Sequence, residues 1–90
     1  MKRVYVIKCE SYRYTARNFW VVQAFTDEKV AIHQLNRLYE WANENKTING
    51  DNEGLDNPLD SKCENNCIGS LDYSIEEVEL NEGSDWSDAE

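Results

Sequence analysis

The sequence predicts an α+β domain, a three-stranded antiparallel sheet with one amphipathic helix packed on one of its faces. Three observations favour this fold. Two stretches rich in β-branched and aromatic residues, 3–11 and 19–25, precede a stretch with helical periodicity, 26–46, and a further strand-like stretch, 71–80, comes after it. One helix and a small sheet bury their apolar faces most economically against each other, which gives the order β-β-α-β.

The first two predicted strands form an antiparallel hairpin, because the connection between them is short. Residues 12–18 are polar and aromatic and contain neither Gly nor Pro, so we expect a long hairpin tip. In residues 3–11 both alternating sets of side chains are apolar near the middle. This pattern predicts a central strand, with the last strand paired along its other edge.

The helical stretch 26–46 has one apolar stripe. We expect the inward side chains to be Ala31, Leu35, Leu38 and Ala42, widened by Ile32 and Tyr39. The opposite face contains His33, Arg37, Glu40 and Glu44. Thr26 or Asp27 can cap the N-terminus of the helix.

Residues 47–70 are rich in Asn, Asp and Gly, and they form a loop longer than the roughly 12–15 residues beyond which loops are usually functional or disordered. In residues 71–80 the apolar alternation changes sides after Ile75, and a bulge near Glu76-Glu77 would explain the change. We therefore expect one domain, residues 1–80, followed by a disordered acidic tail, residues 81–90.

A three-stranded sheet with one helix leaves its second face open. We expect this face to contain some of Tyr5, Ile7, Trp20 and Val22, depending on the register. Exposed aromatic residues on such a face are typical of a partner-binding surface or a homodimer. Alternatively, the long loop folds back over this face.

Charge divides the chain into two halves. Residues 1–46 contain eight Lys/Arg and five Asp/Glu, whereas residues 47–90 contain one Lys and thirteen Asp/Glu. A net charge of −9 argues against direct binding to nucleic acid, because phosphate binding needs Lys and Arg. It favours either a solubilising surface or a protein partner with a basic groove.

The composition also bounds the location of the protein. No apolar run approaches the roughly 18 residues of a membrane span, so no membrane partner is expected. The N-terminal apolar run is interrupted by Lys8 and Glu10 too early for a signal peptide. With three cysteines, an odd number, the sequence favours a cytoplasmic protein.

The acidic half can imitate the phosphate spacing of nucleic acid and so occupy the basic channel of a protein that handles nucleic acid. The alternative is a solvated face that only keeps the protein soluble. The candidate partner-binding carboxylates are Asp51, Glu53, Asp56, Asp60, Asp72, Glu76, Glu77 and Glu79.

The hairpin tip provides the one basic and aromatic patch, Tyr12, Arg13 and Tyr14, with Arg17 next to it. Interleaved Tyr and Arg residues can stack on bases and pair with phosphates. The strongly negative net charge favours docking on a protein instead, where Tyr and Arg are enriched at interface hot spots.

Cysteine spacing gives little support for a metal site. Cys63 and Cys67 form a C-x3-C pair, and Cys9 and His33 bring the possible zinc ligands to four. Zinc knuckles usually have two or four residues between cysteines, so we predict no metal and no cofactor. A 63–67 disulfide is sterically possible, but inert thiols are favoured. The sequence contains no nucleophile motif and no phosphate loop, so we predict no enzymatic activity.

Three segments of the chain resemble small β-β-α-β proteins of bacteriophages and other mobile elements. They are Val4–Val6, the helix entry Ala24–Ala31 and the closing strand Tyr73–Leu80. The chain is also similar in size and acidity to phage inhibitors of host defence, including anti-CRISPR proteins. The resemblance implies no catalytic residues.

Together these observations predict a non-enzymatic phage or mobile-element inhibitor in the cytoplasm of an infected bacterial cell. It would bind a host defence protein, such as a CRISPR-Cas component, and occlude a basic nucleic-acid-binding surface through its acidic residues. One alternative is a small structural or oligomeric accessory protein that uses the open sheet face. Another is a metal-stabilised module built on Cys63 and Cys67.

Overall fold

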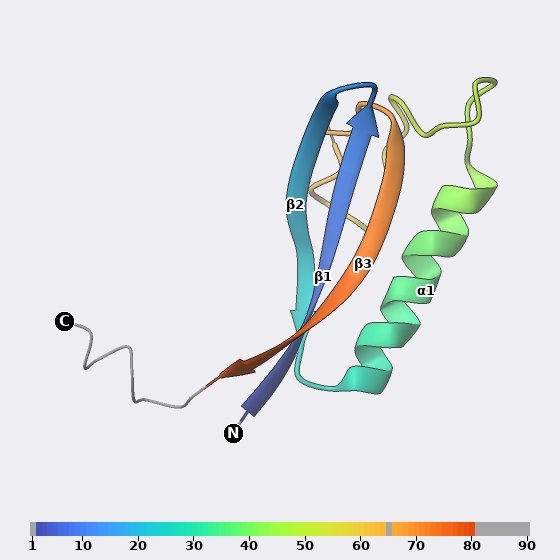
Figure 1. Ribbon diagram of the computed structural model, residues 1–90. Helices are drawn as coiled ribbons and strands as arrows, with labels where there is room; N and C mark the ends of the chain where they lie inside the picture. The colour runs from blue at the N-terminus through green and yellow to red at the C-terminus, as the bar shows by residue number, and fades with distance from the viewer. Residues whose placement is uncertain (1, 65, 81–90) are drawn as a thin grey trace.

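The computed structural model describes residues 2–64 and 66–80. They form β1 (Lys2–Arg13), β2 (Ala16–Phe25), α1 (Glu28–Glu44) and β3 (Ser70–Leu80). The strands make one antiparallel sheet in the order β2-β1-β3, and α1 lies across one face (Figure 1). The predicted fold class and the central position of β1 are confirmed. The predicted tail, 81–90, lies outside the described residues.

The hairpin has longer strands and a shorter tip than the sequence suggested. Pairing of β1 with β2 continues to Tyr12↔Arg17 and Arg13↔Ala16, so the connection is only Tyr14-Thr15. The prediction of a long tip over 12–18 is therefore wrong. Tyr14 makes the tight turn possible by adopting a positive φ of 55°, a conformation that two-residue hairpin turns require.

Helix α1 begins after Asp27, whose carboxylate accepts hydrogen bonds from the backbone N–H groups of Lys29 (2.8 Å) and Val30 (3.2 Å). The central stripe is as predicted: three side chains are buried and a fourth, Leu35, packs against the core. The predicted widening is wrong for Ile32, which is exposed, whereas Tyr39 packs its partly exposed ring edge-on against the buried ring of Tyr73. The covered flank is the opposite one, which contains the half-buried Trp41.

Strand β3 pairs with β1 in an unbroken register from Lys2↔Leu80 to Tyr12↔Ser70. The predicted bulge at Glu76-Glu77 is therefore wrong, and the irregularity lies instead between β1 and β2, at Ile7/Lys8. The apolar alternation of β3 changes because its surroundings change. Figure 1 shows the last part of β3 curving away from α1, so its helix-side positions are no longer covered there.

The loop between α1 and β3 packs on the same sheet face as the helix. Its residues Cys63 and Cys67 belong to one buried cluster with Ile7 and Cys9 of β1, and Figure 1 shows the loop behind β1 and β2. The hydroxyl oxygen of Ser11 accepts hydrogen bonds from the backbone N–H groups that precede β3. The loop therefore does not cover the open sheet face.

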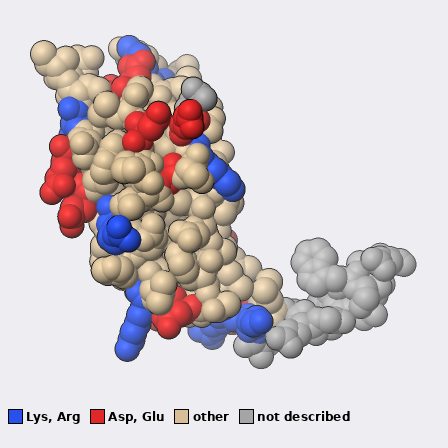
Figure 2. Space-filling model, turned by 180° about the vertical axis from the view of Figure 1, so that it is seen from behind, with Lys and Arg blue, Asp and Glu red and all other residues tan. Residues whose placement is uncertain are grey.

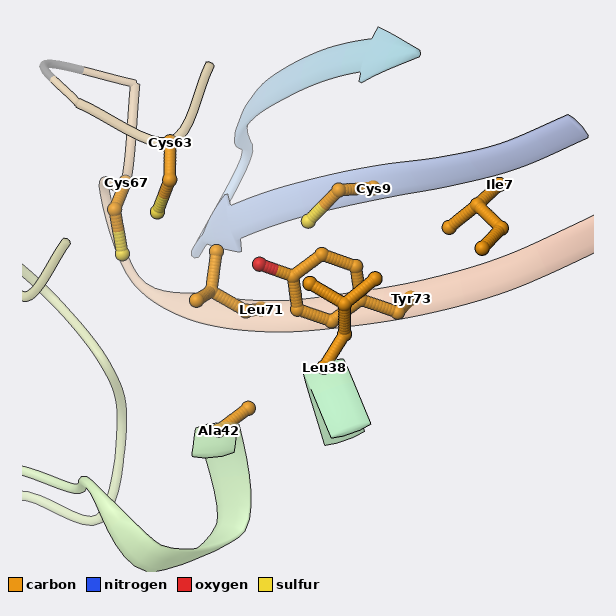
Figure 3. Packing of buried hydrophobic residues seen from close by; sticks show 8 residues of the cluster. All are labelled: Ile7, Cys9, Leu38, Ala42, Cys63, Cys67, Leu71 and Tyr73. Carbon is orange, nitrogen blue, oxygen red and sulfur yellow. The ribbon is translucent and has the colours of Figure 1, made fainter. Parts of the chain in front are cut away.

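The core lies between the sheet, α1 and this loop. In Figure 3, Leu38 points from the helix at the ring of Tyr73, which is fully buried, while Leu71 and the cysteines surround the ring's other end. Burying an aromatic ring and a leucine of this kind typically contributes about 1.5–3 kcal/mol each.

No helix in residues 2–64 and 66–80 is long and apolar enough to cross a membrane.

The register also corrects the expected composition of the open face. Ile7 is buried, and Trp20 and Val22 pack against the core. Because side chains alternate, Tyr5 points to the same side as Ile7. The open face instead contains the opposite set of side chains: Val4, Val6, Phe19, Val21, Val78 and Leu80.

Candidate protein-interaction surfaces

Four of the eight predicted partner-binding carboxylates are engaged in ion pairs within the protein. Glu53 pairs with Arg13 and Glu76 with Lys8. Arg3 pairs with Glu77 (3.0 Å) and with Glu79 (3.5 Å). Exposed pairs of this kind contribute about 0–1 kcal/mol to stability. The three cations Lys8, Arg13 and Arg3 nonetheless balance all but one of the four carboxylate charges, so these residues present little net negative charge.

Asp60 is part of a buried hydrogen-bond network. Its side chain is almost completely buried (2% exposed). Its Oδ2 accepts hydrogen bonds from Trp20 Nε1 (2.8 Å) and from the hydroxyl of Tyr73 (3.1 Å). Its Oδ1 accepts a hydrogen bond from the backbone N–H of Lys62 (3.1 Å). The carboxylate therefore fastens the loop to β2 and β3 and does not reach the surface.

The network continues through Asn57, whose Nδ2 donates a hydrogen bond to the Tyr73 hydroxyl oxygen (3.2 Å). Burial raises the pKa of Tyr73 well above its ordinary value, and the nearby Cys9 adds to the effect. Tyr73 is therefore a neutral hydrogen-bond donor at physiological pH. Its role in this network is structural.

Asp51, Asp56 and Asp72 are the predicted carboxylates that keep a surface position without an ion pair in the described part of the chain. Asp51 Oδ1 accepts a hydrogen bond from the Thr47 hydroxyl (2.6 Å), which holds the pKa of Asp51 below its usual range. Asp72 Oδ1 accepts a hydrogen bond from the Tyr39 hydroxyl (3.3 Å). Asp56 is exposed on the loop.

Three further carboxylates are exposed and form no ion pair in the described part of the chain, although the sequence did not predict them as partner-binding residues. Glu40 and Glu44 lie on the outer side of α1 and Glu64 on the loop, all exposed and none with an ion pair within residues 2–64 and 66–80. Figure 2 shows the acidic side chains of this side in separate groups, along the helix edge and over the loop, with uncharged surface and some Lys and Arg side chains between them.

The hairpin tip displays two arginine–tyrosine pairs. The guanidinium of Arg13 lies 5.7 Å from the ring centroid of Tyr14, and that of Arg17 lies 6.0 Å from the ring centroid of Tyr12. Contacts of this length are cation–π interactions, worth about 0.5–1 kcal/mol at exposed sites. The structure thus brings together the three predicted tip residues and keeps them at the surface.

Tyr14 is unusual in both backbone and side chain. It is the one non-glycine residue with a positive φ among the described residues. For a residue with a Cβ atom this left-handed conformation costs roughly 1–2 kcal/mol. Its ring is 90% exposed, so the strain brings no burial in return.

A groove of about 480 Å³ separates the hairpin tip from the turn that follows α1. The turn is closed by hydrogen bonds from the Gly50 N–H to the Thr47 carbonyl (2.9 Å) and from the Thr47 N–H to the Asp51 carbonyl (2.7 Å). Ile48, which is fully exposed, directly precedes the lining residue Asn49 in the chain. The groove is lined by Tyr12, Arg13, Tyr14, Asn49, Gly50, Asp51 and Ser70.

Cys63 and Cys67 lie in the core as free, adjacent thiols. A hydrogen bond between the two side chains lowers the pKa of Cys67 to about 7 and raises that of Cys63. Burial raises the pKa of Cys9 to about 12. Cys9 and Cys63 are therefore protonated at neutral pH.

The possible zinc ligands do not converge on one point. His33 is on the exposed side of α1, whereas the cysteines are buried. Within residues 2–64 and 66–80 no three His, Cys, Asp or Glu side chains are grouped as a metal site requires.

Sequence reasoning overlooked two buried asparagines, Asn52 and Asn57. One signal was present: Asn and Asp residues favour turns in which the side chain accepts a hydrogen bond from the backbone two residues later. Asp51, Asn57 and Asp60 all do so, at 3.2, 2.9 and 3.1 Å.

No protein-family model, curated protein or solved structure matches the chain.

Proposed function

We propose that this protein is a non-enzymatic inhibitor that binds a protein partner and occludes a basic, nucleic-acid-binding surface. The class of partner is inferred from the charge of the protein. The setting is inferred from the resemblance of its strands and helix entry to phage and mobile-element proteins, which suggests action on a host defence protein. Direct binding of nucleic acid is disfavoured, because the exposed acids repel phosphate.

One observation supports the proposal most strongly: the negative charge remains after internal pairing is taken into account. Fourteen Asp/Glu and nine Lys/Arg lie in the described residues. Five ion-paired carboxylates and the buried Asp60 leave eight carboxylates without ion pairs, of which all but the half-buried Asp51 are exposed: Asp51, Asp56, Asp72, Glu40, Glu44 and Glu64, together with the helix-start residues Asp27 and Glu28.

These carboxylates form separate groups, which suits a partner that normally holds a phosphate backbone at several points. Their mutual repulsion is tolerated because they are solvated. On binding, each would replace a phosphate next to a Lys or Arg of the partner. Association of this kind is steered by charge, and it weakens as salt screens the carboxylates.

The test is capture of the partner from lysate of the bacterial host, followed by competition. We expect the tagged protein to retain a nucleic-acid-binding protein that is released by raised salt and by added duplex DNA or RNA. Capture of a protein that nucleic acid does not displace, or of none, contradicts the proposal.

Two variants with the same change in net charge separate specific binding from general acidity. The triple variant Asp56→Asn, Glu64→Gln, Asp72→Asn removes carboxylates without ion pairs and is expected to lose partner retention. The triple variant Glu76→Gln, Glu77→Gln, Glu79→Gln removes ion-paired carboxylates and is expected to keep it. Equal losses in the two variants would show that only net charge matters.

The open sheet face supports a second candidate function, that of an oligomeric accessory protein. Phe19 is 67% exposed on this face, and Val21 lies beside it. Two charged pairs, Lys8–Glu76 and Arg17–Glu10, cross the same face. Exposed apolar side chains framed by ion pairs are typical of interfaces with a polar rim.

Light scattering at increasing protein concentration tests this candidate. A homodimer that Phe19→Ser converts to a monomer would establish the sheet face as an interface. A wild-type protein that stays monomeric at every concentration would eliminate self-association through this face.

A further inference from the structure

We infer that the groove at the hairpin tip is a binding site for an arginine side chain in a basic segment of the partner protein. The inference rests on the proposed function and goes further, because it names the point of contact and the chemistry recognised. It combines three observations: the strained and exposed Tyr14, the groove next to it, and the carboxylate of Asp51 in the groove lining.

The strain at Tyr14 indicates that the residue is there for its ring. Gly or Asn would make the same turn without the steric cost, and the ring, 90% exposed, contributes little packing inside the protein. Backbone strain that brings no structural benefit is typical of functional positions. The neighbouring Tyr12 ring also lines the groove.

The two tyrosine rings already hold guanidinium groups. Arg13 lies over Tyr14 and Arg17 over Tyr12, at 5.7 and 6.0 Å from the ring centroids. An aromatic ring has two faces, so each ring keeps one for a further cation. The surface is thus suited to stacking a guanidinium, which is planar and weakly hydrated.

The groove also has a carboxylate for the charge of that guanidinium. The charge of Arg13 is balanced by Glu53, which is not among the lining residues. Asp51 is the carboxylate in the lining, and it forms no ion pair within residues 2–64 and 66–80. Asn49 and Ser70 provide further acceptors for the five N–H donors of an arginine.

The groove is held open by the fold rather than by its ligand. Gly69, which precedes Ser70, passes so close to β1 that a Cβ atom on it would lie 2.0 Å from the Tyr12 carbonyl oxygen. Ser70, on the groove wall, is thereby fixed next to the tip. The opposite wall is formed by Asn49, Gly50 and Asp51 of the turn after α1, which its own backbone hydrogen bonds close.

Nucleic acid is the competing occupant, because tyrosines and arginines also bind bases and phosphates. Asp51 and the overall negative charge oppose phosphate at this point. The groove is therefore better suited to a positively charged peptide than to a nucleotide.

The test is an NMR titration of the ¹⁵N-labelled full chain with a peptide of alternating arginine and glycine. We expect chemical-shift changes at residues 12–14, 49–51 and 70. The same peptide with lysine in place of arginine should bind more weakly, since lysine does not stack as a plane. Changes spread evenly over the acidic residues of β3 and α1, or no binding, overturn the inference. A thymidine oligonucleotide that binds the groove instead also overturns it.

Two variants make the result specific. Tyr14→Gly keeps the net charge and relieves the turn, and Asp51→Asn keeps an acceptor for the Thr47 hydroxyl; each is expected to weaken arginine-peptide binding by about tenfold or more. Glu28→Gln removes one carboxylate at the start of α1, outside the groove. It is expected to change the affinity for the arginine peptide by less than about twofold.

The inference and the proposed function can fail separately. If the arginine peptide occupies the groove but no nucleic-acid-binding protein is captured, the inference stands and the proposed function falls. If the partner is captured equally well by Tyr14→Gly, the proposed function stands and the groove is not its contact point.

Discussion

The loop between α1 and β3 and the tip of the β1–β2 hairpin differ in where they place polar and aromatic side chains. The loop buries Asn52, Asn57 and Asp60 in hydrogen bonds, although such residues are usually exposed. The tip exposes Tyr14 on a strained backbone, although such residues are usually at least partly buried. Both regions break the usual pattern of burial, the loop to complete the fold and the tip without burying the ring that it exposes.

The difference gives a way to sort unusual residues by function. A buried polar group that is fully hydrogen-bonded is needed for stability, and its removal leaves partners unsatisfied. An exposed, strained aromatic residue is dispensable for stability and is a candidate for binding.

Asp60→Ala is expected to have the largest effect, a loss of about 3–5 kcal/mol in the free energy of unfolding, because three donors lose their acceptor and each buried donor left unsatisfied costs about 1–3 kcal/mol. The substitution leaves Trp20 Nε1 and the Tyr73 hydroxyl without their shared acceptor inside the core. Urea denaturation followed by tryptophan fluorescence measures the loss. Asp56→Ala, on the exposed part of the same loop, is the control and should change the value by less than about 0.5 kcal/mol. Similar values for the two variants would contradict the contrast between buried and exposed loop acids.

The loop also shows where sequence reasoning reached its limit. The strands, the helix and their order could be predicted, because apolar periodicity and β-branched residues report local geometry directly. Residues 47–70 look like a solvated linker, because their composition is that of a linker. Whether an Asn faces water or a backbone carbonyl depends on contacts between residues distant in sequence, such as Asn57 and Tyr73.

The same limit applies to the predicted site. Acidic residues could be identified from the sequence, but their pairing could not, since Arg13 and Glu53 are 40 positions apart. The tip residues Tyr12, Arg13 and Tyr14 were predicted as a patch. The groove next to them could not be predicted, because its second wall comes from the turn after α1.

Asn52→Ala is expected to cost about 2–3 kcal/mol, since roughly 1 kcal/mol is typical for each hydrogen bond lost. The Asn52 amide donates to the carbonyls of Ala42 (2.9 Å) and Asn45 (2.7 Å) at the end of α1. Its Oδ1 accepts a hydrogen bond from the Leu71 N–H of β3 (3.1 Å). Hydrogen exchange should show faster exchange at Leu71 together with the lower stability. Asn49→Ala, in the exposed turn, is the control.

The pH dependence of stability tests the shifted pKa values of the cysteines buried beneath the loop. Because the folded pKa of Cys67 is lowered to about 7, the folded state binds fewer protons than the unfolded state between pH 7 and about 8, where the three thiols of the unfolded chain are still largely protonated. Stability should therefore rise with pH in this window, by less than about 1 kcal/mol. Above it stability should fall, because the raised pKa values of Cys63 and Cys9 keep protons that the unfolded chain loses.

Urea denaturation under reducing conditions at pH 6.5, 8, 9 and 10 measures this dependence. Cys67→Ala should abolish the rise between neutral pH and about pH 8 and retain the fall at higher pH. A wild-type stability that falls steadily from neutral pH upward would contradict the lowered pKa of Cys67.

Tyr14→Gly is expected to have the smallest effect and the opposite sign. Relief of the left-handed backbone should stabilise the fold by roughly 1–2 kcal/mol. The added flexibility of glycine in the unfolded chain offsets about 0.5–1 kcal/mol of this, and loss of the exposed Arg13 contact offsets about 0.5 kcal/mol more. The net change therefore lies between a loss of about 0.5 kcal/mol and a gain of about 1 kcal/mol, centred slightly on the stabilising side.

Tyr14→Ala separates the backbone from the ring. Alanine keeps the steric cost of the positive φ and removes the ring, so this variant should be slightly less stable than the wild type, whereas Tyr14→Gly should not. Thermal unfolding of the three proteins measures the order. If both variants are clearly destabilised, the ring supports the fold and the contrast with the loop disappears. If glycine equals or exceeds tyrosine in stability, the ring is unnecessary for folding, and its exposed position is explained only by what it binds.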